Sequence, residues 1–112
     1  NVTASAYLMA SDVALKKDIA RVGGLETILA LQGIRFTWNS DGRQDIGVLA
    51  QDVEKVMPEL VVTGQDGYKA VKYPNLVAPL IEAVKDLHGE LAALRAEVEA
   101  QKNAQDKQPE DP

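Results

Sequence analysis

The most regular pattern of apolar and polar positions lies in the last third of the chain, where apolar residues recur in alternating steps of three and four. Set as heptads, the a and d positions are aliphatic until the pattern reaches the polar Gln101: Val77, Leu80, Val84, Leu87, Leu91, Leu94 and Val98. A seam this long is typical of a coiled coil, and it predicts one long helix over residues 77–101. We therefore expect these seven residues to form an interface between helices.

Charged residues flank this seam in the arrangement that adjacent parallel helices use. Glu90 at g with Arg95 at the following e, and then Glu97 with Lys102, are pairs of opposite sign. Valine at a with leucine at d favours two strands by the usual rule, so the heptads alone do not establish a trimer. Pro79 either kinks this helix or marks its true start.

Ahead of the long helix the pattern changes to short alternations separated by turn residues. The predicted strands are residues 34–38, 45–50, 60–63 and 68–73, which form two hairpins. A helix over residues 51–57 is expected between the hairpins, because helical spacing there ends at Pro58. Phe36 and Trp38 share one alternation, so they are expected on the buried face of the first hairpin.

The first third of the chain predicts two short helices, over residues 12–22 and 25–31, separated by a pair of glycines. The first carries an apolar stripe that includes Leu15 and Ile19. Residues 1–10 have neither caps nor a clear period, and we interpret them as an extended segment that arrives from an upstream domain. The fold class is therefore α+β, with short N-terminal helices and small β-hairpins packed on a long C-terminal helix.

Composition limits the chemistry. The chain has 112 residues, of which 46% are hydrophobic and 26% charged, as expected for one small domain. It has no cysteine, and His88 is its single histidine, so a metal centre built on these ligands or a Ser-His-Asp triad lacks its parts and no cofactor is expected. The net charge of −5 argues against nucleic-acid binding, and no apolar run is long enough to span a membrane.

One pair of residues carries candidate chemistry. Ser11 stands at the expected helix start, and Lys16 follows five residues later. Taken alone, this stretch favours a helix N-cap at Ser11 or Asp12 and a surface lysine. The alternative is a serine nucleophile with a lysine base. Residues five apart in a helix point about 140° away from each other, so the two side chains can meet only if Ser11 lies outside the helix.

Four stretches, in this order, carry a resemblance: SDVALKKDI, RFTW, IGVLAQDVEKVMPELV and YKAVKYPNLVAPLIEAVKDL. Through them the chain resembles the C-terminal intramolecular chaperone domain of phage tail spikes and tail fibres, of the endosialidase type. The resemblance includes a Gly-x-x-Ala-Gln element at residues 47–51. It implies that residues 1–10 end an upstream fibre segment and that residues 11–112 form the chaperone domain, with a coiled-coil helix over 77–101 and a frayed tail over 103–112.

The resemblance also implies a function. Such a domain forms a homotrimer, assists folding of the upstream fibre or spike domain of the same chain, and then cuts itself off. In this sequence the cut falls between Ala10 and Ser11, with Ser11 as nucleophile and Lys16 as base, in a single-turnover serine peptidase reaction. The expected location is a phage tail precursor made in the host bacterial cytoplasm. Two other hypotheses stay open: a non-catalytic coiled-coil oligomerisation module, and an adaptor that binds an unrelated helix.

Overall fold

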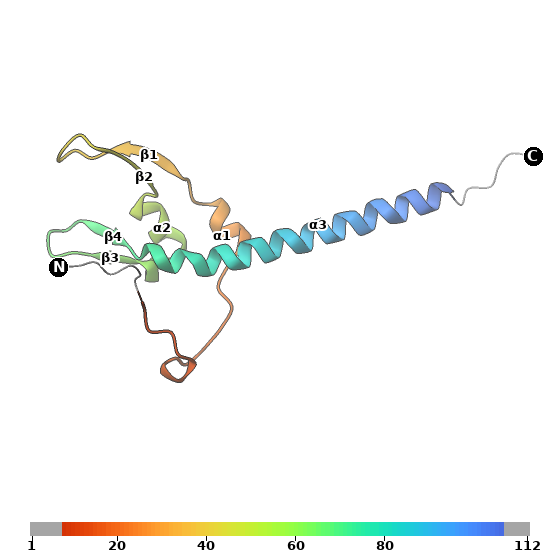
Figure 1. Ribbon diagram of the computed structural model, residues 1–112, viewed down its shortest axis with the longest axis horizontal. Coiled ribbons are helices and arrows are strands. Elements are labelled where there is room, and N and C mark those ends of the chain that lie inside the picture. Colours follow the sequence, from red (N-terminus) through yellow and green to blue (C-terminus); the bar gives the residue numbers. More distant parts are fainter. Residues whose placement is uncertain (1–7, 107–112) are drawn as a thin grey trace, which may run out of the picture.

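The computed structural model describes residues 8–106 of the chain. Two small antiparallel hairpins and several short helices gather at one end of a long helix that extends away from them (Figure 1). The elements in chain order are η1 (Val13–Leu15), α1 (Leu25–Leu29), β1 (Ile34–Thr37), β2 (Gln44–Gly47), α2 (Ala50–Val56), η2 (Pro58–Leu60), β3 (Val61–Thr63), β4 (Lys69–Val71), η3 (Tyr73–Leu76) and α3 (Val77–Asp106). The expected α+β fold with a long C-terminal helix is confirmed.

Both predicted hairpins are present, with strands shorter than expected. β1 pairs with β2 so that Ile34 lies opposite Gly47, and β3 pairs with β4 so that Val61 lies opposite Val71. The first turn contains Gly42 at φ 74°, a left-handed conformation that glycine adopts without steric penalty. Each sheet has two strands, so the hairpins depend on packing against helices for their stability.

The core is small and is formed mainly by α2 and η2. Val53 is fully buried, and Met57 and Leu60 are buried beside it. Partly buried side chains from the neighbouring elements surround this cluster: Leu31, Val48, Val61, Val71 and Leu76. The expected helix after the first hairpin is thus confirmed, and it supplies most of the core.

The aromatic residues of the first hairpin are less covered than predicted. Phe36 is half-buried, but Trp38 remains 42% exposed. Their rings meet edge to face, with centroids 4.9 Å apart, so each ring covers part of the other. The expectation of a buried aromatic face was therefore wrong for Trp38, because the hairpin projects beyond the small core (Figure 1).

The predicted helix over residues 12–22 was wrong. Only one 3-10 turn forms there, η1, and Asp18 adopts a left-handed φ of 54° that is incompatible with a continuing helix. Two residues of the predicted apolar stripe are exposed, at 74% for Leu15 and 69% for Ile19, whereas Val22 is half-buried. A short helix is stabilised mostly by packing of its apolar face, and most of this face lies open in residues 8–106.

The long helix α3 starts at Val77, as predicted, and ends later than predicted. Pro79 is its third residue, where helix N–H groups lack intrahelical partners, so this buried proline belongs to the helix start. The helix continues to Asp106, so the predicted fraying was wrong for residues 103–106. The rest of the predicted tail and most of the predicted upstream segment lie outside the described residues.

A tyrosine at the entry to α3 holds the end of the first hairpin. The Tyr73 hydroxyl accepts a hydrogen bond from the Val48 N–H at 3.1 Å and donates to the Val48 carbonyl at 3.4 Å. It passes directly over Gly47, where an added Cβ would lie 2.5 Å from the hydroxyl oxygen. The glycine that begins the Gly-x-x-Ala-Gln element is therefore required by close packing.

Candidate functional site

The structure brings Ser11 and Lys16 together. Lys16 Nζ donates a hydrogen bond to Ser11 Oγ at 2.8 Å. The contact depends on η1, which reverses the chain between the two residues; the Lys16 N–H donates to the Val13 carbonyl at 3.1 Å. Asp12, not Ser11, caps this turn, because its carboxylate accepts from the Ala14 N–H at 2.9 Å. Ser11 thus lies outside the helical turn, as a meeting with Lys16 requires.

The pair lies along one wall of an open pocket of about 510 Å³. Met9 and Ala10 line the same wall, so the Ala10–Ser11 peptide bond borders this space. Met57 from the core and residues 77–79 from the first turn of α3 line the pocket as well. The Ala10–Ser11 bond, at which the resemblance predicts cleavage, therefore lies beside the start of the long helix.

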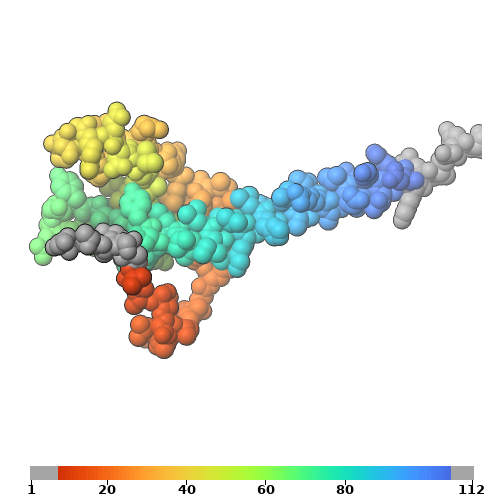
Figure 2. Space-filling view, in the orientation of Figure 1, coloured from red at the N-terminus to blue at the C-terminus, as the bar shows by residue number. Residues whose placement is uncertain are grey.

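Ala10, Ser11 and Lys16 are all exposed in one chain. The segment that carries them projects from the body of the domain, in red and orange in Figure 2. The Ser11 hydroxyl lies within hydrogen-bond distance of the Lys16 amine, and the carbonyl of Ala10 precedes it in the chain. A hydroxyl, an amine and a carbonyl are the groups that an acyl transfer uses.

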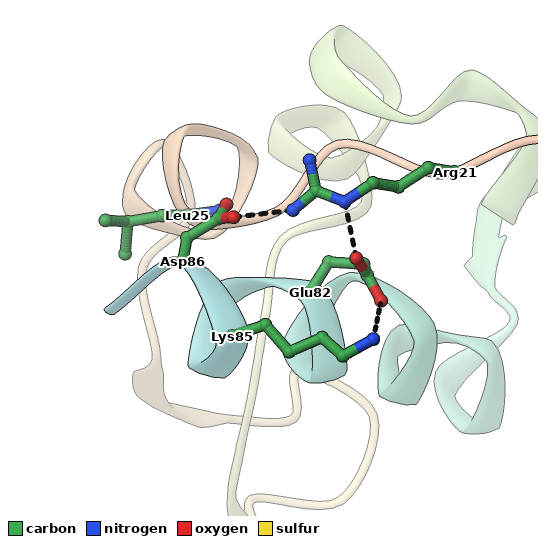
Figure 3. Close-up of polar contacts among 5 residues, drawn as sticks. All are labelled: Arg21, Leu25, Glu82, Lys85 and Asp86. Atoms are coloured by element: carbon green, nitrogen blue, oxygen red, sulfur yellow. Dashed lines mark hydrogen bonds and ion pairs between the residues drawn. The ribbon is translucent and has the colours of Figure 1, made fainter. Parts of the chain in front are cut away.

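The cleavage segment, residues 10–24, is joined to α3 by an ionic cluster that the sequence did not reveal. Arg21 contacts two carboxylates: its Nε lies 2.5 Å from Glu82 Oε1, and its Nη2 lies 2.5 Å from Asp86 Oδ1 (Figure 3). Asp86 also accepts a hydrogen bond from the Leu25 N–H at 3.0 Å, at the start of α1. Lys85 is a peripheral member, 3.7 Å from Glu82.

The cluster changes the acidity of both carboxyl groups. Hydrogen bonding from Arg21 lowers the pKa of Glu82, because it favours the charged form. The pKa of Asp86 is lowered first by the Leu25 N–H and then by Arg21. The spacing of Glu82 and Asp86, one helical turn apart, was visible in the sequence, but their partner lies 61 residues before Glu82 and no local pattern identifies it.

The seven seam residues of α3 are exposed along its length. Their exposed fractions run from 46% to 65%: Val77, Leu80, Val84, Leu87, Leu91, Leu94 and Val98. The flanking residues Glu90, Arg95, Glu97 and Lys102 make no ion pair within residues 8–106. The stripe is separate from Pro79 and Ala83, the two buried residues of the helix.

Between residues 8 and 106, no group of three or more histidine, aspartate or glutamate side chains is placed to hold a metal ion. In the same residues, no helix combines the length and apolar character needed to cross a bilayer.

Comparison with known proteins yields one match. No curated protein matches the chain significantly. A peptidase family model, described as "Chaperone of endosialidase", matches residues 11–62. The match starts at Ser11, includes Lys16, and runs through the first hairpin and the core helix α2 into β3. Through this segment the chain is similar to the chaperone of endosialidase family, a family of peptidases.

Proposed function

We propose that this chain is a C-terminal intramolecular chaperone of a phage tail fibre or tail spike that removes itself by autoproteolysis between Ala10 and Ser11. The observation that carries the proposal is the 2.8 Å contact between Lys16 Nζ and Ser11 Oγ. It occurs in an exposed segment at the first residue of the family match, where a helix cap would have explained the serine without any chemistry. Asp12 performs that capping role instead.

The proposed reaction begins with attack of Ser11 Oγ on the carbonyl carbon of Ala10. Lys16, in its neutral form, accepts the hydroxyl proton. A C–O bond forms, the peptide C–N bond breaks, and the proton passes to the Ser11 nitrogen, which leaves as an α-amine. The resulting ester between Ala10 and Ser11 Oγ is hydrolysed by water. Nucleophile and carbonyl belong to adjacent residues, so the first step gains from proximity.

We infer that three copies assemble through the α3 seam. In a lone chain the seam leaves seven aliphatic side chains about half exposed, and each one that is fully buried contributes roughly 1.5–3 kcal/mol. The e and g charges are free to pair between parallel helices. The number three rests on the family resemblance, because the heptads themselves favour two strands.

Assembly and cleavage fit one sequence of events. Exposed apolar residues of the cleavage segment, including Leu15 and Ile19, can be covered by neighbouring copies. Cleavage then follows assembly and removes the helper from the folded fibre. A trimer that has lost its assembly factor cannot readily retrace its folding path, so its persistence depends on the rate of unfolding.

The partners in this proposal are two further copies of the chain and the upstream fibre or spike domain. The precursor is made in the host bacterial cytoplasm, and the released domain is absent from the mature tail. A chain cut once by its own serine acts in a single turnover.

The test is cleavage of a fusion that carries the native upstream segment before Asn1. Wild type is expected to give two bands on a denaturing gel, with mass spectrometry locating the new N-terminus at Ser11. Ser11→Ala and Lys16→Ala should leave the full-length band, while Lys17→Ala, which removes an adjacent exposed lysine, should cleave as wild type does. Unchanged cleavage in both site variants removes the mechanism.

Sedimentation of the same fusions separates the other hypotheses. A wild-type fusion that keeps its intact mass after long incubation, yet sediments as an oligomer, is a non-catalytic oligomerisation module. A monomer that assembles only with an added helical partner is an adaptor. The proposal requires a trimer that cleaves.

A further inference from the structure

The cleavage segment makes one contact within itself and one with the body of the domain. Lys16 contacts Ser11 inside the segment, and Arg21 contacts Glu82 and Asp86 of α3 (Figure 3). Residues between them are exposed and form no helix or strand. The position of Lys16 relative to the body of the domain therefore depends on where Arg21 is held.

The contact between Arg21 and α3 is specific in its geometry. Glu82 and Asp86 are like charges at i and i+4, a pairing that destabilises a helix unless a cation lies between them. A planar guanidinium binds both carboxylates at once through different nitrogens, whereas an ammonium group has a single nitrogen for both. Glu82 has a side-chain exposure of 17% and Asp86 of 34%, so neither charge is fully solvated.

Backbone packing reinforces this contact between residues 21–25 and α3, which we call the joint. Gly24 lies so close to α3 that an added Cβ would be 2.8 Å from the Glu82 carbonyl carbon. Asp86 meanwhile receives the Leu25 N–H. The chain that leaves Arg21 is thus fixed against α3 for several consecutive residues.

The joint and the seam occupy different faces of one helix. Glu82 and Asp86 fall at heptad positions f and c, about 150° around the helix from the mean direction of the a and d residues. α3 can therefore hold its own cleavage segment on one face while its other face contacts further copies of the chain.

We propose that Arg21 is a positioning residue for the cleavage reaction, and that through it α3 sets the geometry of the Ser11–Lys16 pair. This inference rests on the proposed function. It makes cleavage conditional on a formed α3, because the two carboxylates align only when residues 82 and 86 lie one helical turn apart. A misplacement of about 1 Å at a reacting group can cost on the order of 100-fold in rate.

The experiment compares cleavage rates in the full-length fusion, expressed per assembled trimer as measured by sedimentation. Arg21→Gln is expected to lower this rate by about 10- to 100-fold. Arg21→Lys keeps the positive charge but loses the planar guanidinium, and its cleavage rate per trimer is expected to fall by about 3- to 10-fold. Arg43→Gln is the matched control, because Arg43 contacts Asp41 and Trp38 in the first hairpin and should cleave as wild type does.

The pH dependence of cleavage and the rate per trimer distinguish a positioning role for Arg21 from a general loss of structure. The pH at which the rate is half-maximal should stay unchanged in Arg21→Lys, because the same base still accepts the proton. A purely structural role would reduce the amount of trimer and leave the rate per trimer unaltered. If Arg21→Gln fails to assemble, the rate per trimer of Arg21→Lys decides the question.

The outcomes separate the two proposals. If wild type cleaves, Ser11→Ala does not, and both Arg21 variants match wild type per trimer, the positioning role is overturned and the proposed function stands. If wild type does not cleave, or Ser11→Ala still does, the proposed function fails and the positioning role falls with it.

Discussion

The close approach of Gly24 to α3 leads to a sharp prediction about stability. A Cβ at this position would lie 2.5 Å from Asp86 Oδ2, 2.8 Å from the Glu82 carbonyl carbon and 2.9 Å from its oxygen. Two of these atoms belong to the backbone of a helix and cannot turn aside. The Gly24→Ala variant must therefore push α1 away from α3 or displace Asp86 from the Leu25 N–H.

The expected cost follows from these distances. Ordinary contacts of a methyl group lie at 3.4–4 Å, so the two segments must separate by several tenths of an ångström to about 1 Å. Overpacking of this kind typically costs about 1–3 kcal/mol. Replacing glycine by alanine also stiffens the unfolded chain, which offsets roughly 0.4–1 kcal/mol of that cost.

The neighbouring glycine supplies a matched control. At Gly23 the nearest obstacle to a Cβ is the side-chain oxygen of Thr27, at 2.6 Å, which rotation of one side chain removes. Gly23→Ala has the same effect on the unfolded chain, so the difference between the two variants reflects the folded chain alone. We expect Gly24→Ala to be less stable than Gly23→Ala by about 1–3 kcal/mol.

The assay is urea unfolding followed by far-ultraviolet circular dichroism, in a Ser11→Ala background that keeps the chain intact. All variants are measured at one protein concentration, because association makes apparent stability depend on concentration. Equal midpoints and slopes for the two alanine variants would refute the reasoning, since they would mean that α1 does not rest on α3 in solution.

Three further predictions concern the contact between Gly47 and Tyr73, the seam of α3 and the ionic cluster of Arg21, Glu82 and Asp86. Gly47→Ala should destabilise the domain by about 1–3 kcal/mol, and combining it with Tyr73→Phe should recover part of that loss in a double-mutant cycle of urea unfolding. Leu87→Asp with Leu94→Asp should sediment as a monomer, and cleavage of its fusion should fall if assembly sets the site; cleavage equal to wild type would contradict that order of events. The pKa of Asp86 is lowered in the folded chain from its ordinary 3.8, so its contribution is complete above about pH 4 and is lost as the pH falls through the lower folded value. Amide exchange of residues 25–29, corrected for intrinsic pH dependence, should show protection that falls below pH 4 in wild type, and Asp86→Asn should lack this change.

The elements that the sequence predicted well are those in which a local pattern and its packing agree. The two hairpins carry turn glycines between alternating residues, and α2 buries Val53 next to Met57, which follows its last turn. The long helix repeats its apolar positions over many turns, so its prediction did not depend on tertiary contacts. It continues past residue 102, where the polar sequence predicts fraying, because the residues involved are compatible with a helix.

The segment of residues 12–22 shows the opposite case. Its apolar spacing fits a helix, but Leu15 and Ile19 stay exposed in the described chain, and one 3-10 turn forms instead. The failure of that helix is what allows Ser11 and Lys16 to meet, because a continuous helix would have pointed them apart.

Residue types, spacing and resemblance were enough to identify the candidate serine and lysine, the α+β class and the heptad seam. Only the folded chain shows that Asp12 rather than Ser11 caps the turn, that Gly47 makes room for the Tyr73 hydroxyl, and that Arg21 reaches Glu82 and Asp86. The physical reason is the distance along the chain over which each kind of interaction acts. Propensity and periodicity act over a few residues and are written in the local sequence. A hydrogen bond between residues 61 positions apart exists only after the chain has folded back on itself.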